Sequence, residues 1–286
     1  MSAAPGRPKQ ARTAARMGGG TPATALRIHV EGIGLFGPGL TGWSQACAVL
    51  TGQAPFELAT VQLPPVTALP PAERRRVGVA IKLALASGFE AIEQAGANAA
   101  QLATVFSSTG GDCDNCHNIL ETLASSDRAV SPTRFHNSVH NAPAGYWSIA
   151  TGCMTASTSL CAFDATFAAG LLEAATQAVS TDQPCLLIAF DTAYPPPLAA
   201  LRPIPHAMGV GLLLNPHASA ASRAALNIDL CSAAVTPMDD PALENLRQSI
   251  PAARSLPLLQ LLARGCAGSV VIDYLGTPNL SISVQP

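Results

Sequence analysis

Cys161 is the residue whose type and position best suit covalent chemistry. It stands where an expected strand, residues 155–160, passes into an expected helix, residues 162–178. The free N–H groups and the dipole at a helix N-terminus favour a thiolate and can also stabilise an oxyanion. Free cysteines are, however, among the most often buried residues. Position alone therefore leaves two interpretations of Cys161 open, a nucleophile and a structural thiol.

A CxxCH sequence runs from Cys113 through Cys116 to His117. This pattern fits covalent haem attachment, which needs an oxidising compartment, or part of a zinc site, which needs further ligands. No second CxxC is present, and no signal-peptide hydrophobic region follows the basic residues at the N-terminus. We therefore expect ordinary thiols on a helix face rather than a haem or zinc site.

Two histidines, His136 and His140, are four residues apart and share one face if their segment is helical. No acid lies between them as in the HExxH zinc motif. We expect these histidines and Asn141 to make polar contacts at a pocket or an interface, and we expect no metal site.

The segment GIGLFG, residues 32–37, satisfies the GxGxxG pattern of a dinucleotide-binding loop. Pro38 and Gly39 interrupt the helix that should begin there, and no well-placed acid follows about 20 residues later. A tight turn at the end of a strand is the better interpretation. The GxSxG elbow of α/β-hydrolases is absent.

The composition indicates which classes of partner the protein can bind. Lys and Arg number 16 and Asp and Glu 18, so charged residues make up 12% of the chain, against about 25% in an average soluble protein. So few charges suggest that a partner covers part of the surface. The net charge of −2 argues against nonspecific nucleic-acid binding. No apolar run is long enough for a membrane span, and eight irregularly spaced cysteines fit a reducing, cytoplasmic setting.

The order of expected elements predicts an α/β layered fold with antiparallel strands near its C-terminus. Residues 1–24 form a basic tail that we expect to be disordered, and residues 25–286 form a single domain. Strands are expected at 26–31, 102–107, 155–160, 184–190, 207–214, 225–230, 269–274 and 279–284. Helices are expected at 43–52, 71–94, 114–124, 137–150, 162–178, 241–249 and 255–263.

Five segments resemble, in the same order, parts of the β-ketoacyl synthases: residues 27–39, 80–96, 131–149, 152–161 and 207–214. The resemblance covers about 26–216 and is closest to small chain-length-factor-like relatives, through SPTRFHNSVHNAPAG at 131–145. It implies half of a thiolase-like fold, with a mixed five-stranded sheet layered with helices and a short C-terminal α/β extension. It also implies a role in fatty-acid, aryl-polyene or polyketide assembly, with no bound cofactor and with acyl groups delivered on the phosphopantetheine of a carrier protein.

The sequence departs from that family in two ways. A complete synthase has a second half that supplies two His, or a His and an Asn, for decarboxylation; here the last histidine, His217, is followed by too few residues for one. Active synthases also place small residues after the cysteine, whereas Phe163 and Asp164 stand here. A ring and a carboxylate at these positions crowd an acyl chain and oppose thiolate formation.

Three hypotheses follow. The favoured one is a subunit that does not condense by itself and acts with a full-length synthase, or as a dimer, and with acyl carrier protein. Arg74, Arg75 and Arg76 would then contact the acidic carrier, although a solvated first helical turn is the simpler explanation of this cluster. The alternatives are an acyltransferase of the β-ketoacyl synthase type that uses Cys161, and a non-catalytic scaffold.

Overall fold

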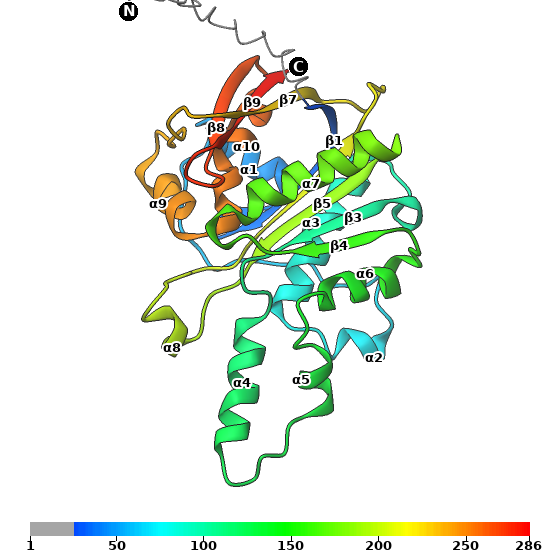
Figure 1. Cartoon of the computed structure of the whole chain (residues 1–286), viewed down its shortest axis with the longest axis vertical. Helices are drawn as coiled ribbons and strands as arrows, with labels where there is room; N and C mark the ends of the chain where they lie inside the picture. The colour runs from blue at the N-terminus through cyan, green and yellow to red at the C-terminus, as the bar shows by residue number, and fades with distance from the viewer. Residues whose placement is uncertain (1–25) are drawn as a thin grey trace, which may run out of the picture.

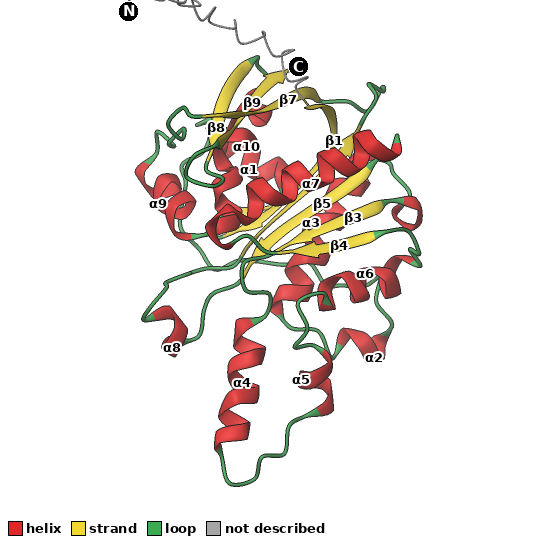
Figure 2. Cartoon of the chain, viewed as in Figure 1, coloured by secondary structure: helices red, strands yellow, loops and turns green. Residues whose placement is uncertain are grey.

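The computed structural model describes residues 26–286, so the expected basic tail lies outside the described residues. The described chain forms one nine-stranded mixed sheet, with strand order β4-β3-β5-β6-β1-β7-β9-β8 and β2 beside β1, between layers of helices (Figures 1 and 2). The strands are β1 (Leu26–Gly37), β2 (Leu40–Thr41), β3 (Ala103–Ser107), β4 (Ser157–Leu160), β5 (Cys185–Asp191), β6 (Met208–Asn215), β7 (Ala224–Cys231), β8 (Gly268–Ile272) and β9 (Asn279–Gln285).

The α-helices are α1 (Trp43–Leu50), α2 (Pro71–Arg74), α3 (Val79–Ala95), α4 (Cys113–Ala124), α5 (Pro132–His136), α6 (Ala142–Thr151), α7 (Thr166–Thr181), α8 (Pro196–Ala199), α9 (Pro241–Ser249) and α10 (Leu256–Arg264). Three 3₁₀ helices accompany them: η1 (Ala99–Gln101), η2 (Phe163–Ala165) and η3 (Pro251–Ser255).

The layered α/β prediction is confirmed, but the prediction of a five-stranded sheet is wrong. Strand β3 pairs in parallel with β4 and β5, and every other neighbouring pair is antiparallel. The C-terminal strands do not form a separate cap, because β7 pairs with the first half of β1 and carries β9 and β8 into the same sheet.

The sheet is covered on both faces. Helices α3 and α6 pack on one face, whereas α7, η3, α1 and α10 lie on the other (Figure 1). Strand β5 is buried along its whole length, as expected for a central strand that is an unbroken apolar run up to its last residue. Two buried apolar clusters, one on each face, therefore stabilise the fold.

Strand β1 is longer than predicted because its glycines are not turn residues. Gly32 and Gly34 lie inside the strand, and a Cβ atom on Gly34 would overlap the backbone carbonyl of Ser87 in α3. Gly211 on the neighbouring strand β6 faces the same carbonyl. These glycines let α3 approach the sheet closely, so neither a dinucleotide loop nor a tight turn explains them.

The helix expected over 71–94 is interrupted. Helix α2 ends at Arg74, and α3 begins only at Val79. A Cβ atom at Gly78, in this break, would lie 2.7 Å from the carboxylate of Asp112. Asp112 is the N-cap of α4 and accepts the N–H of Asn115 at 3.0 Å. The break between α2 and α3 therefore lies against the start of α4, a helix that is distant in the sequence.

Helices α4 and α5 project from the body as an arm (Figure 1). Side chains exposed along this arm and the turn after it include Leu120, Leu123, Phe135 and Val139. Among residues 26–286 there is no helix that is both long and apolar enough to span a bilayer.

The two edges of the sheet differ. At the β8 edge, the loop between β7 and α9 pairs with the strand: Thr236 N–H donates to the Val271 carbonyl at 2.9 Å, and its hydroxyl accepts the Val271 N–H at 2.9 Å. At the β4 edge, no other segment of the described chain pairs with the outer side of the strand. In the described residues, the β8 edge is therefore blocked at Val271, whereas the β4 edge is open along its length.

Candidate functional site

The turn between β4 and α7 is the place where the sequence predicted a nucleophile. Strand β4 ends at Leu160, the 3₁₀ helix η2 covers Phe163–Ala165, and α7 begins at Thr166. Phe163 has a φ of 53°, in the left-handed region that a residue with a large side chain rarely adopts. Such strain between a strand and a helix marks the position at which some enzymes hold their nucleophile, and here that position carries a phenyl ring.

Cys161 lies two residues before the strained position and one residue beyond the end of β4. Its side chain is exposed, and no described residue forms a hydrogen bond with its sulfur atom. The prediction that this thiol lies at a helix N-terminus is therefore wrong. The thiol is also not buried as a structural cysteine would be.

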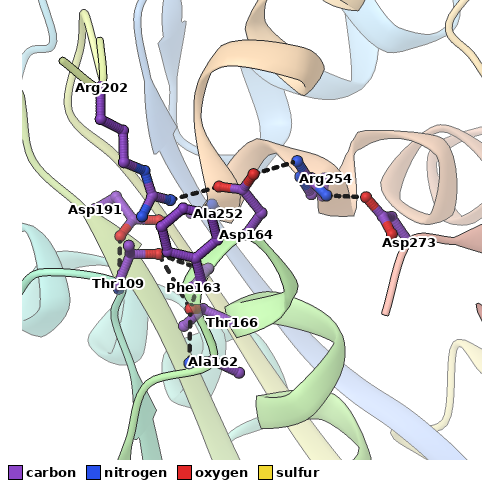
Figure 3. A network of polar contacts seen from close by, with 10 residues as sticks. All are labelled: Thr109, Ala162, Phe163, Asp164, Thr166, Asp191, Arg202, Ala252, Arg254 and Asp273. Carbon is purple, nitrogen blue, oxygen red and sulfur yellow. Dashed lines mark hydrogen bonds and ion pairs between the residues drawn. The ribbon is translucent and has the colours of Figure 1, made fainter. Parts of the chain in front are cut away.

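Threonine hydroxyl groups form hydrogen bonds with the backbone of the turn (Figure 3). The Ala162 N–H donates to Thr166 Oγ1 at 3.1 Å, and the hydroxyls of Thr166 and Thr109 both donate to the Phe163 carbonyl, at 2.6 and 2.7 Å. An oxyanion hole requires N–H donors aimed at the reacting group. One candidate donor, the Ala162 N–H, already has a partner within the protein.

A chain of ion pairs lies beside the turn (Figure 3). Asp164 pairs with Arg202 and, at 3.2 Å, with Arg254, which also pairs with Asp273. The Arg202 guanidinium carbon stands 3.5 Å from the centre of the Phe163 ring, a cation–π contact. Asp164 thus holds two arginines over the turn.

Asp191, at the end of β5, is the buried acid of this region. Only 1% of the residue is exposed, and its two oxygens accept the N–H groups of Thr109 and Ala252, each at 2.8 Å (Figure 3). The carboxylate therefore ties the loop after β3 and the start of η3 to the end of β5. Burial raises its pKa to about 7, against the lowering effect of these hydrogen bonds.

Stability should depend on the protonation of Asp191. Because its folded pKa lies above the unfolded value of about 3.9, the contribution is complete below that value and is lost as the pH rises towards 7. We expect the free energy of unfolding to fall by up to about 1.4 kcal/mol per pH unit in this range from this group. Urea unfolding of the wild type and of Asp191→Asn at pH 4.5 to 7.5 tests this. The asparagine variant should lose most of the slope, and the exposed control Asp239→Asn should keep it; equal slopes in all three would contradict the assignment.

The two histidines do not share a helix face. His136 ends α5 and packs edge-on against the Tyr146 ring, whereas His140 lies in the turn before α6. His140 Nε2 donates to the Ser108 carbonyl at 2.8 Å, which places the ring near the loop after β3. Asn141 is exposed at the start of α6. None of the three forms a hydrogen bond with the turn at Phe163.

The three arginines expected to meet a carrier protein point to different partners. Arg74 donates to the carbonyls of Thr67 and Leu69 at 3.1 and 3.0 Å, which fixes its side chain against the preceding loop. Arg76 pairs with Glu73 at 2.8 Å. Arg75 has no ion pair within residues 26–286.

Arg75 and Arg76 line a cavity of about 790 Å³ together with Arg134 of the arm. The cavity lies between the start of α3, the base of the arm and the segment after β5, and Tyr194, Asn137 and Asp112 also line it. Its volume is in the range of small-molecule sites. It brings together residues that the sequence did not connect, since Arg134 belongs to an unpredicted helix.

The CxxCH segment opens helix α4, as the helical interpretation required. Burial raises the pKa of the Cys113 and Cys116 thiols, so both are held in the neutral form. His117 pairs with Glu121 one turn later. In the described part of the chain, no group of three or more His, Cys, Asp or Glu side chains could hold a metal ion.

A family model for the N-terminal domain of β-ketoacyl synthases matches residues 43–266, which is most of the chain. The chain belongs to the β-ketoacyl synthase family. A search of curated protein sequences gives no match.

Solved ketosynthase structures share the fold. A chain from the complex of the ketosynthase ApeO with its chain length factor ApeC, from Xenorhabdus doucetiae, has a TM-score of 0.68 at 22% identity, covering 91% of this chain and 99% of that one. A chain of the ishigamide ketosynthase/chain length factor gives 0.66 at 15% identity, with 90% and 99% covered. A β-ketoacyl synthase from Burkholderia phymatum gives 0.61 at 12% identity, with 91% and 99% covered.

The sequence did not predict the polar residues Asp191, Arg202 and Arg254, which surround the turn between β4 and α7. All three lie far from Asp164 in the sequence: Asp191 is 27 residues later, Arg202 is 38 residues later and Arg254 is 90 residues later. Only Asp191 had a local signal, because a carboxylate that ends an apolar strand is an unusual choice for a buried position.

Proposed function

We propose that this chain is a chain-length-factor-like subunit that does not condense by itself and assembles with a full-length β-ketoacyl synthase in fatty-acid, aryl-polyene or polyketide synthesis. The observation that carries the proposal is Phe163, which occupies the strained position between β4 and α7. A phenyl ring has no atom that can form an acyl-enzyme. The stacked Arg202 guanidinium and the ion-paired Asp164 hold this ring in place.

The surroundings of Cys161 also favour a subunit without condensing activity. Condensation needs a thiolate together with groups that activate decarboxylation of the extender unit. His136 and His140 make their contacts with Tyr146 and Ser108 instead. The internal bond of the Ala162 N–H supports the same interpretation.

The open β4 edge supports a protein partner. The segments that precede and follow the strand expose large apolar side chains: Met154 is 92% exposed and Phe163 is 65% exposed. An unpaired strand edge with apolar neighbours is a surface that soluble proteins normally cover. Because the related structures include a ketosynthase in complex with its chain length factor, a synthase subunit is the partner that we propose.

The α4–α5 arm also exposes large apolar residues. Leu120 and Phe135 are 64% and 70% exposed. An arm that projects from the body with such side chains is costly in water and fits a role in reaching over a partner. The low content of charged residues agrees with a covered surface.

The arginine-lined cavity supports contact with an acyl carrier protein. Arg75, Arg76 and Arg134 offer guanidinium groups to the acidic surface and phosphate of a carrier. Arg74 contributes less, because its guanidinium is held by backbone carbonyls. Acyl groups would arrive on the phosphopantetheine of that carrier.

Intact-protein mass spectrometry tests the non-condensing assignment. Wild type and Cys161→Ala are each mixed with acyl-loaded and malonyl-loaded carrier protein, beside a complete synthase as the positive control. We expect no acyl adduct on either form, because the exposed thiol lacks activating partners. A stable adduct on the wild type that is absent from Cys161→Ala would overturn the proposal and make the protein a Cys161-dependent acyltransferase.

A further inference from the structure

A second cavity, of about 480 Å³, lies on the α3 face of the sheet, away from the turn at Phe163. The segment 64–68 forms one wall, and one side of α3 forms the other. Phe36, Leu85, Val66 and Phe89 supply apolar side chains to it. Cavities of this size with mostly apolar walls and a few polar groups are typical of small-molecule sites.

The polar groups of this cavity are two carboxylates one helical turn apart, Glu90 and Glu93. Glu90 is fixed in the wall, because its oxygens accept the N–H groups of Leu35 at 2.8 Å and Trp43 at 2.5 Å. Burial raises the pKa of Glu90, and the neighbouring Glu93 adds to that effect. Negative charge therefore extends from the partly buried Glu90 to the exposed Glu93 at the rim of the cavity.

No basic side chain of residues 26–286 forms an ion pair with either carboxylate. The residues that line the cavity include no Lys, Arg or His, and neither Glu90 nor Glu93 forms an ion pair within residues 26–286. Arg74 is the basic side chain that contacts the same wall, but its guanidinium donates to the carbonyls of Thr67 and Leu69. A positive ligand would supply the missing charge.

We propose that this cavity binds a small organic cation with an apolar body, of the alkylammonium class. The ammonium group would lie against Glu90 and Glu93, and the alkyl chain would contact Phe36 and Phe89. Its wall is preformed, because Pro64 and Pro65 restrict the backbone of the loop and Arg74 holds the carbonyls that follow. This inference does not depend on the proposed role in acyl-chain assembly.

Calorimetric titration of the full chain with hexylammonium and with hexanoate tests the proposal. The two probes share an alkyl chain and differ in the sign of their charge. We expect hexylammonium to bind and hexanoate not to bind at the same concentrations. Glu93→Gln should weaken hexylammonium about threefold, the effect typical of one exposed ion pair. Ala68→Trp, which places a ring at the rim of the cavity, should abolish binding.

Glu121→Gln, which removes an exposed carboxylate on the distant helix α4, is the matched control and should bind as the wild type does. Ala68 and Glu93 are both exposed, so neither substitution threatens the fold. Equal binding of the two probes would overturn the charge assignment. Binding that survives Ala68→Trp, or no binding of hexylammonium to the folded wild type, would overturn the site itself.

Discussion

Replacing Gly34 by valine should leave the chain without a stable fold. A Cβ atom at this position would overlap the Ser87 carbonyl oxygen and lie 2.9 Å from its carbon, and these are backbone atoms of α3 that no side-chain rotation can move. Helix α3 would have to leave the sheet, together with its buried leucines and alanines. We expect a loss of at least about 4 kcal/mol, a large part of the stability of a typical domain.

Urea unfolding followed by circular dichroism, together with the yield of soluble protein, measures this effect. Gly145→Ala is the matched control, because Gly145 is exposed in α6 and a Cβ atom there would meet no other atom within 4 Å. That variant should be as stable as the wild type or up to about 1 kcal/mol more stable, since alanine favours helices. Equal midpoints for the two variants would show that α3 does not depend on this close approach.

Replacing Ser159 by proline should weaken assembly with a synthase partner while leaving the subunit folded. The carbonyls of Ala156 and Leu160 accept N–H groups from β3, so the alternation along a strand turns the backbone of Ser159 to the open edge. Proline there removes an outward N–H without breaking a bond of the chain's own sheet, and proline is tolerated in edge strands.

Co-purification of the tagged subunit with a full-length synthase measures the effect, with circular dichroism as the check on folding. Ser159→Thr is the control, because threonine favours strands and keeps the N–H. We expect the threonine variant to retain the partner and the proline variant to lose at least about tenfold in affinity, as the loss of a strand hydrogen bond and its neighbours implies. A proline variant that still retains the partner would place the interface elsewhere on the molecule.

The elements that the sequence predicted best are those with local signals. Helix α9 begins where Asp240 accepts the N–H groups of Ala242 and Leu243, a cap that precedes Pro241 in the sequence. Strand β5 is an apolar run that ends before a proline-rich segment. In both cases neighbouring residues determine the element, so periodicity and capping are sufficient.

The errors have long-range causes. The glycines of β1 have the composition of a turn, and only their contact with α3, more than 50 residues away, explains them as strand residues. The prediction of a five-stranded sheet was wrong because no local pattern in the sequence shows that β7 pairs with β1. Family resemblance predicted the order of the segments up to residue 216, but the placement of the C-terminal strands lay beyond it.

The sequence predicted the place of the turn between β4 and α7 but not its geometry. The sequence located the transition from strand to helix and flagged Phe163 and Asp164 as unusual after Cys161. It did not reveal that the left-handed residue is Phe163, because a φ value at a non-glycine residue has no signature in the sequence. The arginines that neutralise Asp164 come from two distant loops, so its expected repulsion of a thiolate is compensated in the structure.

The difference between the two edges of the sheet limits how many chains can join. Within residues 26–286, the β7–α9 loop blocks the β8 edge at Val271 through Thr236, whereas the outer side of β4 is unpaired along its whole length. A subunit with two open edges can polymerise into a filament, since each added copy presents a new edge. A subunit that pairs along one edge alone forms a closed pair, and no further subunit can be added by strand pairing.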